Sequence, residues 1–125
     1  MLNHMVEHAQ AASDSLGRVF GALADPTRRQ ILSRLREGDA TIGTLAEPLP
    51  MSFAAVSKHV RVLERAGLLR REVRGREHRL SLDAAPLRDV TAWSLDYQEF
   101  WNDRLDALER VLRRRKRNAK PGRAR

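Results

Sequence analysis

The chain has 125 residues, a length that suits one modest hydrophobic core rather than two independent domains of usual size. It holds 24 lysines and arginines against 16 aspartates and glutamates, and it has no cysteine. The lack of cysteine excludes disulfides, thiolate metal sites and thiol nucleophiles, and is compatible with a reducing compartment. Residues 1–13 do not resemble a secretion signal and no apolar run approaches the length of a membrane span, so we expect a cytoplasmic protein without a membrane partner.

The formal net charge of +8 is unevenly distributed. Residues 113–125 contain eight basic side chains and no acidic one, which leaves 16 of each sign in the rest of the chain. Residues 18–79 carry 13 basic and 7 acidic side chains, whereas residues 83–112 carry 3 and 7. This segregation suits a domain that presents its first part to phosphates. We expect residues 1–14 to be flexible, residues 15–112 to form the folded domain and residues 113–125 to be a disordered basic tail.

Two helices are predicted in the first third of the folded domain. The first spans Ser15 to Ala24 and has an apolar stripe made by Leu16, Val19, Phe20 and Leu23. Asp25 can cap the second helix, and Pro26 fits its first position, where the missing N–H would have no partner. The second helix should run to about Glu37, end at Gly38 and turn three side chains inward, those of Ile31, Leu32 and Leu35.

A short helix and a longer one follow. Thr41 is expected to cap the short helix, which extends through Leu45 and Ala46, and Pro48 and Pro50 form the connection to the next. Ser52 can cap the longer helix, which stops at Gly67. Helical spacing predicts an inward apolar stripe of Phe53, Val56, Val60 and Leu63, and an outward face of Ala54, Lys58, Arg61 and Arg65.

Two short runs joined at Gly75 then predict a β-hairpin, with strands over Leu68 to Arg74 and Glu77 to Leu82. Glycine permits the positive φ that a tight turn often needs. Five arginines surround the hairpin: Arg70, Arg71, Arg74, Arg76 and Arg79. A helix with a small and cationic outer face followed by a basic hairpin predicts a mainly α fold with a small β-hairpin, the winged helix-turn-helix. In this fold the helix before the hairpin, the recognition helix, enters the major groove of double-stranded DNA.

The last predicted helix spans Asp83 to about Arg114. Its broad apolar stripe consists of Leu87, Val90, Trp93, Tyr97, Phe100, Trp101, Leu105, Leu108 and Leu112. A helix of about thirty residues is about 45 Å long, which exceeds the diameter of a small winged-helix core. The simplest partner for the excess apolar surface is the same helix of a second copy. A homodimer would place two recognition helices about one DNA turn apart and favour an inverted-repeat site.

Four segments together resemble the ArsR-type winged helix-turn-helix transcriptional repressors. They are Phe20 to Arg29, Thr44 to Pro48, Met51 to Leu69 and the Gly75-Arg76 turn, and the resemblance covers roughly Ser15 to Leu112. It implies a dimeric DNA-binding regulator that often represses its own operon, with the first and last helices forming the dimer interface. It also implies that Ser52, Ala55, Ser57, Lys58 and His59 lie near DNA, together with Arg74 and Arg76 in the wing.

Two sets of candidate site residues result from the outward helix face and the resemblance. The predicted DNA-contact set is Ser52, Ala54, Ala55, Ser57, Lys58, His59, Arg61, Arg74 and Arg76. The predicted dimer-interface set is Leu16, Val19, Phe20, Val90, Trp93, Tyr97, Trp101, Leu105 and Leu108.

We expect no metal and no cofactor, since the chain departs from the metal-sensing members of the family. Those members carry cysteine pairs on the third helix or histidine and acidic ligands on the last one, and this chain has neither set. Asp96, Asp103 and Asp106 in the last helix have no imidazole partner there, and acidic groups alone make a poor transition-metal site. The chain resembles the subgroup that lacks the cysteine site. The resemblance also places His59 on the DNA-facing helix and His78 in the wing, where they are expected to bond to DNA or to neighbouring residues rather than to a metal.

The aromatic series Trp93, Tyr97 and Trp101 has two interpretations. Aromatic residues at spacings of four are more often part of a dimer core than of a ligand box. The alternative is an apolar small-molecule inducer wedged between these rings and the first helix, where repacking would change the separation of the two recognition helices. The basic tail at residues 113–125 also has two interpretations: it contacts DNA phosphates nonspecifically, or it only makes the protein more soluble.

An enzyme is not expected. The chain offers no phosphate-binding glycine loop, no identifiable pair of catalytic carboxylates and no nucleophile elbow, and Ser57 and His59 project about 200° apart on their helix. The sequence predicts a sequence-specific transcriptional regulator, an autoregulatory repressor that binds an inverted-repeat operator as a homodimer. The alternative functions are a winged-helix protein-interaction module and a nonspecific DNA-binding protein.

Overall fold

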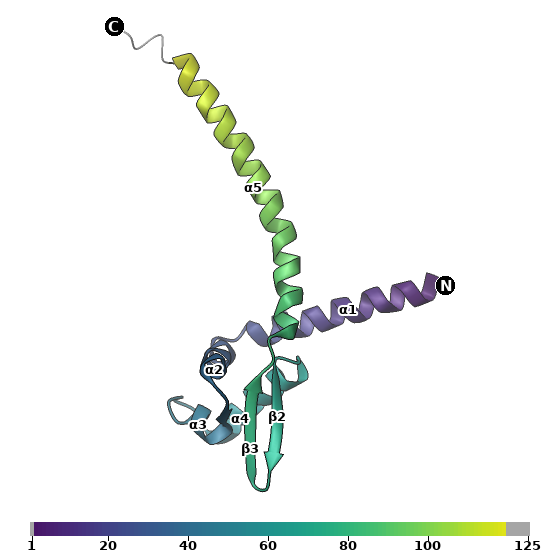
Figure 1. Cartoon of the computed structure of the whole chain (residues 1–125), viewed down its shortest axis with the longest axis vertical. Helices are drawn as coiled ribbons and strands as arrows, with labels where there is room; N and C mark the ends of the chain where they lie inside the picture. Colours follow the sequence, from purple (N-terminus) through teal and green to yellow (C-terminus); the bar gives the residue numbers. More distant parts are fainter. Residues whose placement is uncertain (1, 120–125) are drawn as a thin grey trace. The chain divides into compact units, whose positions relative to one another are not determined.

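The computed structural model describes residues 2–119, with side chains from residue 10 onwards. The elements in chain order are α1 (Leu2–Leu23), α2 (Pro26–Glu37), β1 (Ala40–Thr41), α3 (Ile42–Ala46), α4 (Phe53–Arg65), β2 (Leu69–Arg74), β3 (Glu77–Leu82) and α5 (Ala85–Ala119) (Figure 1). One compact unit ends at Val90, and a second unit begins at Thr91 within α5. The first unit has the order and the hairpin of a winged helix-turn-helix, as the sequence predicts.

The core of the first unit is formed by apolar side chains from every helix up to α4 and from the hairpin. Val56, Val60 and Leu63 of α4 are fully buried, so the predicted inward stripe is confirmed at these three positions. The buried set is Val19, Ala22, Ile31, Leu32, Leu35, Ile42, Leu45, Val56, Val60, Leu63, Leu68, Leu69 and Leu80. The inward stripe predicted for α2 is also confirmed, because Ile31, Leu32 and Leu35 belong to this set.

Phe53 does not belong to the core, and its predicted inward position was wrong. Its side chain is 58% exposed, although it stands three residues before the buried Val56. Helical spacing places it near the inward stripe, but Phe53 is the first residue of α4 and lies at the edge of the core, where it lines an open cavity.

Three polar side chains fix the starts of α2, α3 and α4, and each of these predicted caps is confirmed. Asp25 accepts hydrogen bonds from the backbone N–H groups of Thr27 at 2.8 Å and Arg28 at 3.2 Å. The Thr41 hydroxyl accepts from the N–H of Thr44, and the Ser52 hydroxyl accepts from the N–H of Ala55 at 3.1 Å. Each bond satisfies a donor that has no partner within its own helix.

The cap of α2 also shifts the ionisation of Asp25. Burial of the carboxyl group opposes its ionisation, but the N–H groups of Arg28 and Thr27 outweigh this effect with the help of nearby positive charge. The pKa of Asp25 is therefore lower than its usual value, so the cap is ionised at neutral pH.

The end of α4 is set by Gly67, which has a φ of 77°. The N–H of Gly67 bonds to the carbonyl of Glu64 at 3.0 Å, and the N–H of Leu68 bonds to the carbonyl of Leu63 at 3.0 Å. This pair of bonds is the Schellman motif, which needs a residue in the left-handed region and so favours glycine. It turns the chain directly from the recognition helix into β2.

The sheet has three antiparallel strands in the order β1-β3-β2. In the hairpin, Leu69 pairs with Leu82 and Arg74 pairs with Glu77, which leaves a two-residue turn of Gly75 and Arg76. Gly75 has a φ of 61°, as the sequence predicts for a tight turn. β1 is not predicted from the sequence; in it, Ala40 pairs with Leu80 and Thr41 pairs with Arg79.

The two long helices extend further than predicted. α1 begins at Leu2 rather than Ser15, and α5 begins at Ala85 and continues to Ala119, past the expected end at Arg114. Residues 2–14 and 113–119 contain neither glycine nor proline, and Ala, Arg, Lys, Glu and Gln favour the helix there. The part of the predicted disordered tail at residues 120–125 lies outside the described residues.

Within residues 2–119, no helix combines the length and the apolar character needed to cross a lipid bilayer.

The different burial of two α4 side chains gives a stability prediction. Leu63→Ala should lower the free energy of unfolding by about 2–5 kcal/mol, because it leaves a cavity in a packed core. Phe53→Ala should lower it by less than about 1 kcal/mol, because the ring already faces solvent. Urea unfolding followed by circular dichroism measures both values, and equal losses would contradict the placement of Phe53.

Candidate nucleic-acid interface

The outward face of α4 is the part of the first unit best suited to approach DNA. Ala54, Lys58 and Arg61 are exposed, while Val56 and Val60 anchor the opposite side of the helix in the core. Alanine at position 54 leaves the start of the helix free of bulk, so the backbone can come close to a groove. Lys58 and Arg61 make no hydrogen bond or ion pair with the side chains described for residues 10–119, so both cations are available to phosphates or base edges.

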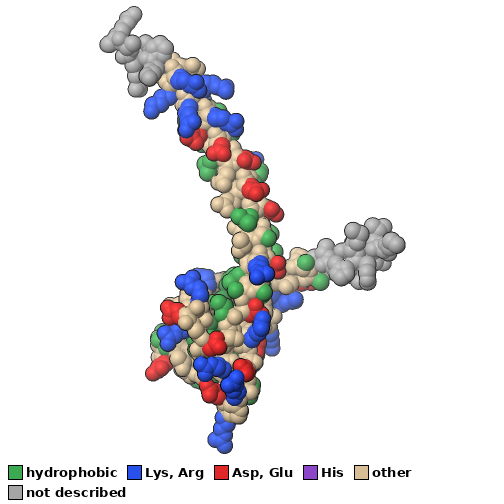
Figure 2. Space-filling view, in the orientation of Figure 1, with side chains coloured by type: hydrophobic (Ala, Val, Ile, Leu, Met, Phe, Trp, Pro, Cys, Tyr) green, Lys and Arg blue, Asp and Glu red, His purple; other side chains and the backbone are tan. Residues whose placement is uncertain are grey.

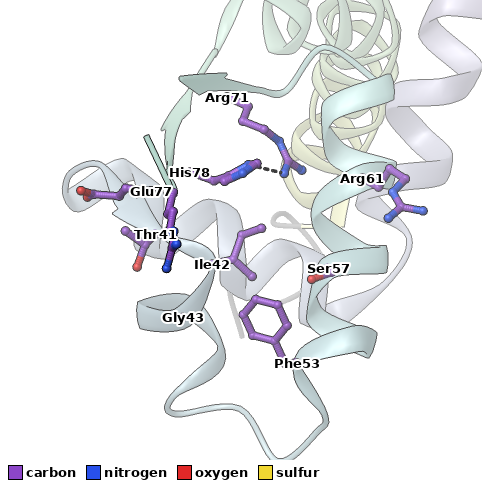
Figure 3. Close-up of a pocket in the computed structure, with 10 residues that line it drawn as sticks. Thr41, Ile42, Gly43, Phe53, Ser57, Arg61, Arg71, Glu77 and His78 are labelled. Carbon is purple, nitrogen blue, oxygen red and sulfur yellow. Dashed lines mark hydrogen bonds between the residues drawn. The ribbon is translucent and has the colours of Figure 1, made fainter. Parts of the chain in front are cut away.

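Ser52, Ala55, Ser57 and His59 flank this outward face. Ser52 is exposed and uses its oxygen as the helix cap, which leaves the hydroxyl proton free to be donated. Ala55, Ser57 and His59 are half-buried. Ser57 lies on the side of α4 that faces the hairpin and lines the cavity there (Figure 3).

His59 lies on the side of α4 that faces α2, where it contacts Arg28. The distance between Arg28 Nη1 and His59 Nδ1 is 3.3 Å. A guanidinium group has only donors, so the imidazole Nδ1 must accept, and the neutral ring then carries its proton on Nε2. His59 can therefore offer an N–H donor to DNA from Nε2.

Arg28 also binds the end of α1. Its Nε donates to the carbonyl of Ala22 at 2.7 Å, and its Nη2 donates to the carbonyl of Gly21 at 3.0 Å. Arg29 acts in parallel, since its Nη1 donates to the carbonyl of Leu23 at 2.7 Å. These bonds satisfy carbonyls that the end of a helix leaves without partners, and they place positive charge at the negative end of the α1 dipole.

Helical spacing does not predict this role of Arg28. The available signal was its position, three residues after the Asp25 cap and immediately beyond a helix end. From there a long cationic side chain can reach back to the preceding carbonyls.

Most arginines of the hairpin are neutralised by neighbouring carboxylates. Arg70 pairs with Asp83 at 3.0 Å, Arg74 pairs with Glu72 at 3.0 Å, and Arg79 pairs with Glu77 at 3.6 Å. Arg71 makes two bonds to Glu64, at 3.2 and 3.3 Å. Arg76, at the turn, has no such partner among the carboxylates described from residue 10 onwards. Figure 2 shows blue side chains at the hairpin tip, with red ones among them further up the strands.

The ion pairs differ in what they imply for DNA contact. The N–H of Ala85 is the main cause that lowers the pKa of Asp83, and Arg70 adds to it, so this carboxylate stays charged and holds Arg70. The pair between Arg74 and Glu72 is exposed on both sides, and pairs of this kind contribute little to stability. A DNA phosphate can therefore replace Glu72 as the partner of Arg74.

The predicted dimer-interface residues lie in different environments. Val19 is only 1% exposed and belongs to the core of a single chain, whereas Leu16, Phe20 and Val90 are half-buried. Trp93, Tyr97, Trp101, Leu105 and Leu108 of α5 are exposed. Within α5, the Trp93 and Tyr97 rings are 4.8 Å apart, and the Arg104 guanidinium lies 4.2 Å from the centre of the Phe100 ring.

Among the side chains that the structure describes, those of residues 10–119, no group of three or more histidines, cysteines, aspartates or glutamates is placed to hold a metal ion. His78 has a different partner, because Arg71 Nη1 lies 3.0 Å from its Nδ1. His59 and His78 thus each use one ring nitrogen to accept from an arginine.

Comparisons with known proteins agree with this geometry. A family model described as a helix-turn-helix domain matches residues 23–72. The transcriptional repressor SdpR of Bacillus subtilis is 35% identical over 82 residues, which cover 66% of this chain and 91% of that protein. The HTH-type transcriptional regulator Rv2034 of Mycobacterium tuberculosis is 37% identical over 95 residues, which cover 76% and 86%. A crystal structure of an ArsR family transcriptional regulator matches with a TM-score of 0.69 and 39% identity, over 72% of this chain and 93% of that one.

The exposed cationic face of α4 and the hairpin beside it define a winged helix-turn-helix DNA-binding protein. The chain belongs to the ArsR family of transcriptional regulators, as the resemblance in the sequence predicts. It is a DNA-binding regulator of transcription and not an enzyme.

The contact between Arg28 and His59 gives a spectroscopic prediction. In the native protein at about pH 8, where an ordinary imidazole is neutral, the ¹⁵N spectrum of His59 should show an unprotonated Nδ1 and a protonated Nε2. Arg28→Met removes the donor, so the two tautomers should mix. Arg29→Met removes a similar bond to the end of α1 without touching His59 and should leave the spectrum unchanged. A native spectrum with the proton on Nδ1 would contradict the assignment.

Proposed function

We propose that the protein is an autoregulatory repressor that binds an inverted-repeat operator as a homodimer. The observation that carries this proposal is the outward face of α4, where Lys58 and Arg61 have no partner in the described chain and Ala54 leaves room for close approach. The proposed DNA contacts are Ser52, Ala54, Ala55, Ser57, Lys58, His59 and Arg61 from α4, with Arg74 and Arg76 from the hairpin.

Some of the proposed contacts would contribute to affinity for any DNA, and others would contribute to sequence specificity. Phosphate contacts by Lys58, Arg74 and Arg76 would supply affinity for any duplex. Arg61 and the Nε2–H of His59 are the donors best suited to acceptors on base edges. Ala54 and Ala55 offer only apolar contacts, so DNA shape would contribute to the discrimination.

The proposed dimer interface uses the apolar side of α5 together with Leu16 and Phe20 of α1. A row of large side chains along α5 is 45–58% exposed: Trp93, Tyr97, Phe100, Trp101, Leu105, Leu108, Val111 and Leu112. A 35-residue helix is about 52 Å long, and an exposed apolar row of this length favours a partner. A second copy supplies a matching row through a twofold axis. The proposed interface omits Val19, whose burial in one chain leaves it no surface for a partner.

An apolar inducer held by Trp93, Tyr97 and Trp101 remains the alternative use of part of this row. The continuity of the row along α5 supports the dimer, since a small ligand would cover only a fraction of it.

Sequence-specific binding can be tested with the DNA upstream of the protein's own gene. Its affinity, measured by fluorescence anisotropy near physiological salt, should exceed that for a scrambled duplex by more than about 10³-fold. The double variant Lys58→Ala, Arg61→Ala should lose at least tenfold of the specific affinity, and its log–log salt slope should become shallower by about 0.9 for each phosphate that the variant no longer neutralises. The control Arg34→Ala, Arg36→Ala removes the same charge from the exposed surface of α2. An affinity ratio near one for the native protein would favour a nonspecific DNA-binding protein or a protein-interaction module.

The dimer proposal predicts a dependence on the apolar row of α5. Leu105→Glu should convert a dimer into a monomer, because it places a charge within a buried interface. Ala92→Glu adds the same charge about 140° away around the helix from Leu105, at an exposed position outside the apolar row, and should leave the dimer intact. Sedimentation velocity measures both, and a monomeric native protein at micromolar concentration would refute the interface.

A further inference from the structure

A cavity of about 360 Å³ lies between α4, the hairpin and the β1-α3 junction (Figure 3). Its walls come from three separate segments, within residues 41–43, 53–61 and 71–78, which the fold brings together. The volume lies within the range of small-molecule sites, which are mostly apolar with a few placed polar groups. The lining residues are Thr41, Ile42, Gly43, Phe53, Ser57, Arg61, Arg71, Arg76, Glu77 and His78.

The apolar wall of the cavity consists of Ile42 and Phe53. Both side chains point into the shared space in Figure 3. Ile42 is 8% exposed and belongs to the core, whereas Phe53 keeps 58% of its surface accessible. A phenyl ring held at the mouth of a cavity provides a flat surface on which an aromatic ligand can stack.

The charged groups of the cavity leave a net positive character. Glu77 pairs with Arg79, and Arg71 is held by Glu64 and by its contact with His78. Arg61 on α4 and Arg76 at the turn have no such partner among the side chains described for residues 10–119. The two unpaired guanidinium groups favour an anion, and carboxylates fit them well because they accept two parallel N–H bonds.

We propose that this cavity binds a small aromatic carboxylate, with its ring against Phe53 and Ile42 and its carboxylate bonded to Arg61 or Arg76. The ligand would compete with DNA, since both arginines belong to the proposed DNA-contact set. The competition, although not the binding itself, rests on the proposed function. Such a ligand acts on the recognition helix directly and needs no change at the dimer interface.

Binding is tested by titrating 2-naphthoate into the full-length protein and following backbone amides by ¹H–¹⁵N NMR. The expected result is saturable shifts centred on residues 41–43, 53–57 and 76–78. Phe53→Ala and the double variant Arg61→Ala, Arg76→Ala should each weaken binding at least tenfold, whereas Phe100→Ala, which removes an exposed ring of α5, should not. Neutral 2-naphthylmethanol should bind at least tenfold more weakly than the carboxylate. Shifts centred on α5, or equal affinity in the Phe53 and Phe100 variants, would overturn the proposal. Circular dichroism melts establish that each variant is folded.

The competition is tested separately with labelled upstream DNA. Saturating 2-naphthoate should lower the DNA affinity of the native protein at least tenfold and that of Phe53→Ala less than twofold. If naphthoate binds as described but the native protein shows no specific DNA binding, the proposed function fails and the cavity assignment stands. If DNA binding is specific but naphthoate leaves it unchanged at saturation, the competitive role fails.

Discussion

The burial of one side of α4 is the constraint on which the rest of the first unit depends. Val56, Val60 and Leu63 are inaccessible to solvent, and the helix they anchor packs against α1, α2, α3 and β2. Because the helical repeat places these three side chains on one face, Ala54, Lys58 and Arg61 are left on the other. The Ser52 cap and the Gly67 turn fix where this helix begins and ends, so the same few residues determine both the core and the DNA-facing surface.

Ion pairs within the first unit leave fewer cations available to DNA than a count of basic residues suggests. The hairpin contains five arginines in and around its strands, but four of them lie beside carboxylates from Glu64, Glu72, Glu77 and Asp83. Of the cations on α4 and the hairpin, those left without a carboxylate partner are thereby on the exposed side of α4 and at the tip of the hairpin. A regulator gains from this arrangement because a uniformly basic surface would bind every duplex and leave little preference for one site.

The sequence was a good guide wherever a single local interaction decides the structure. The caps at Asp25, Thr41 and Ser52 and the turns at Gly67 and Gly75 could be predicted because each depends on residues within five positions of one another. β1 could not, since two residues have no readable periodicity and their pairing partner is some forty residues away. The exposure of Phe53 and the reach of Arg28 toward His59 depend on which elements pack together, and helical spacing alone does not contain that information. Membership of the ArsR family was visible in the sequence, because its motifs lie in the locally determined segments.

The arginines at the start of α2 disfavour domain swapping of α1 between two copies of this chain. Proteins with a protruding terminal helix can form domain-swapped dimers, in which the helix is exchanged and the connection beside it opens as a hinge. Here the carbonyls of Gly21, Ala22 and Leu23 are held by Arg28 and Arg29 across the short link between α1 and α2. Opening that link would break three hydrogen bonds and leave the end of α1 uncapped. An exchange of α1 between copies is therefore disfavoured at its most obvious hinge, and two copies of the chain can associate while each keeps its own first helix.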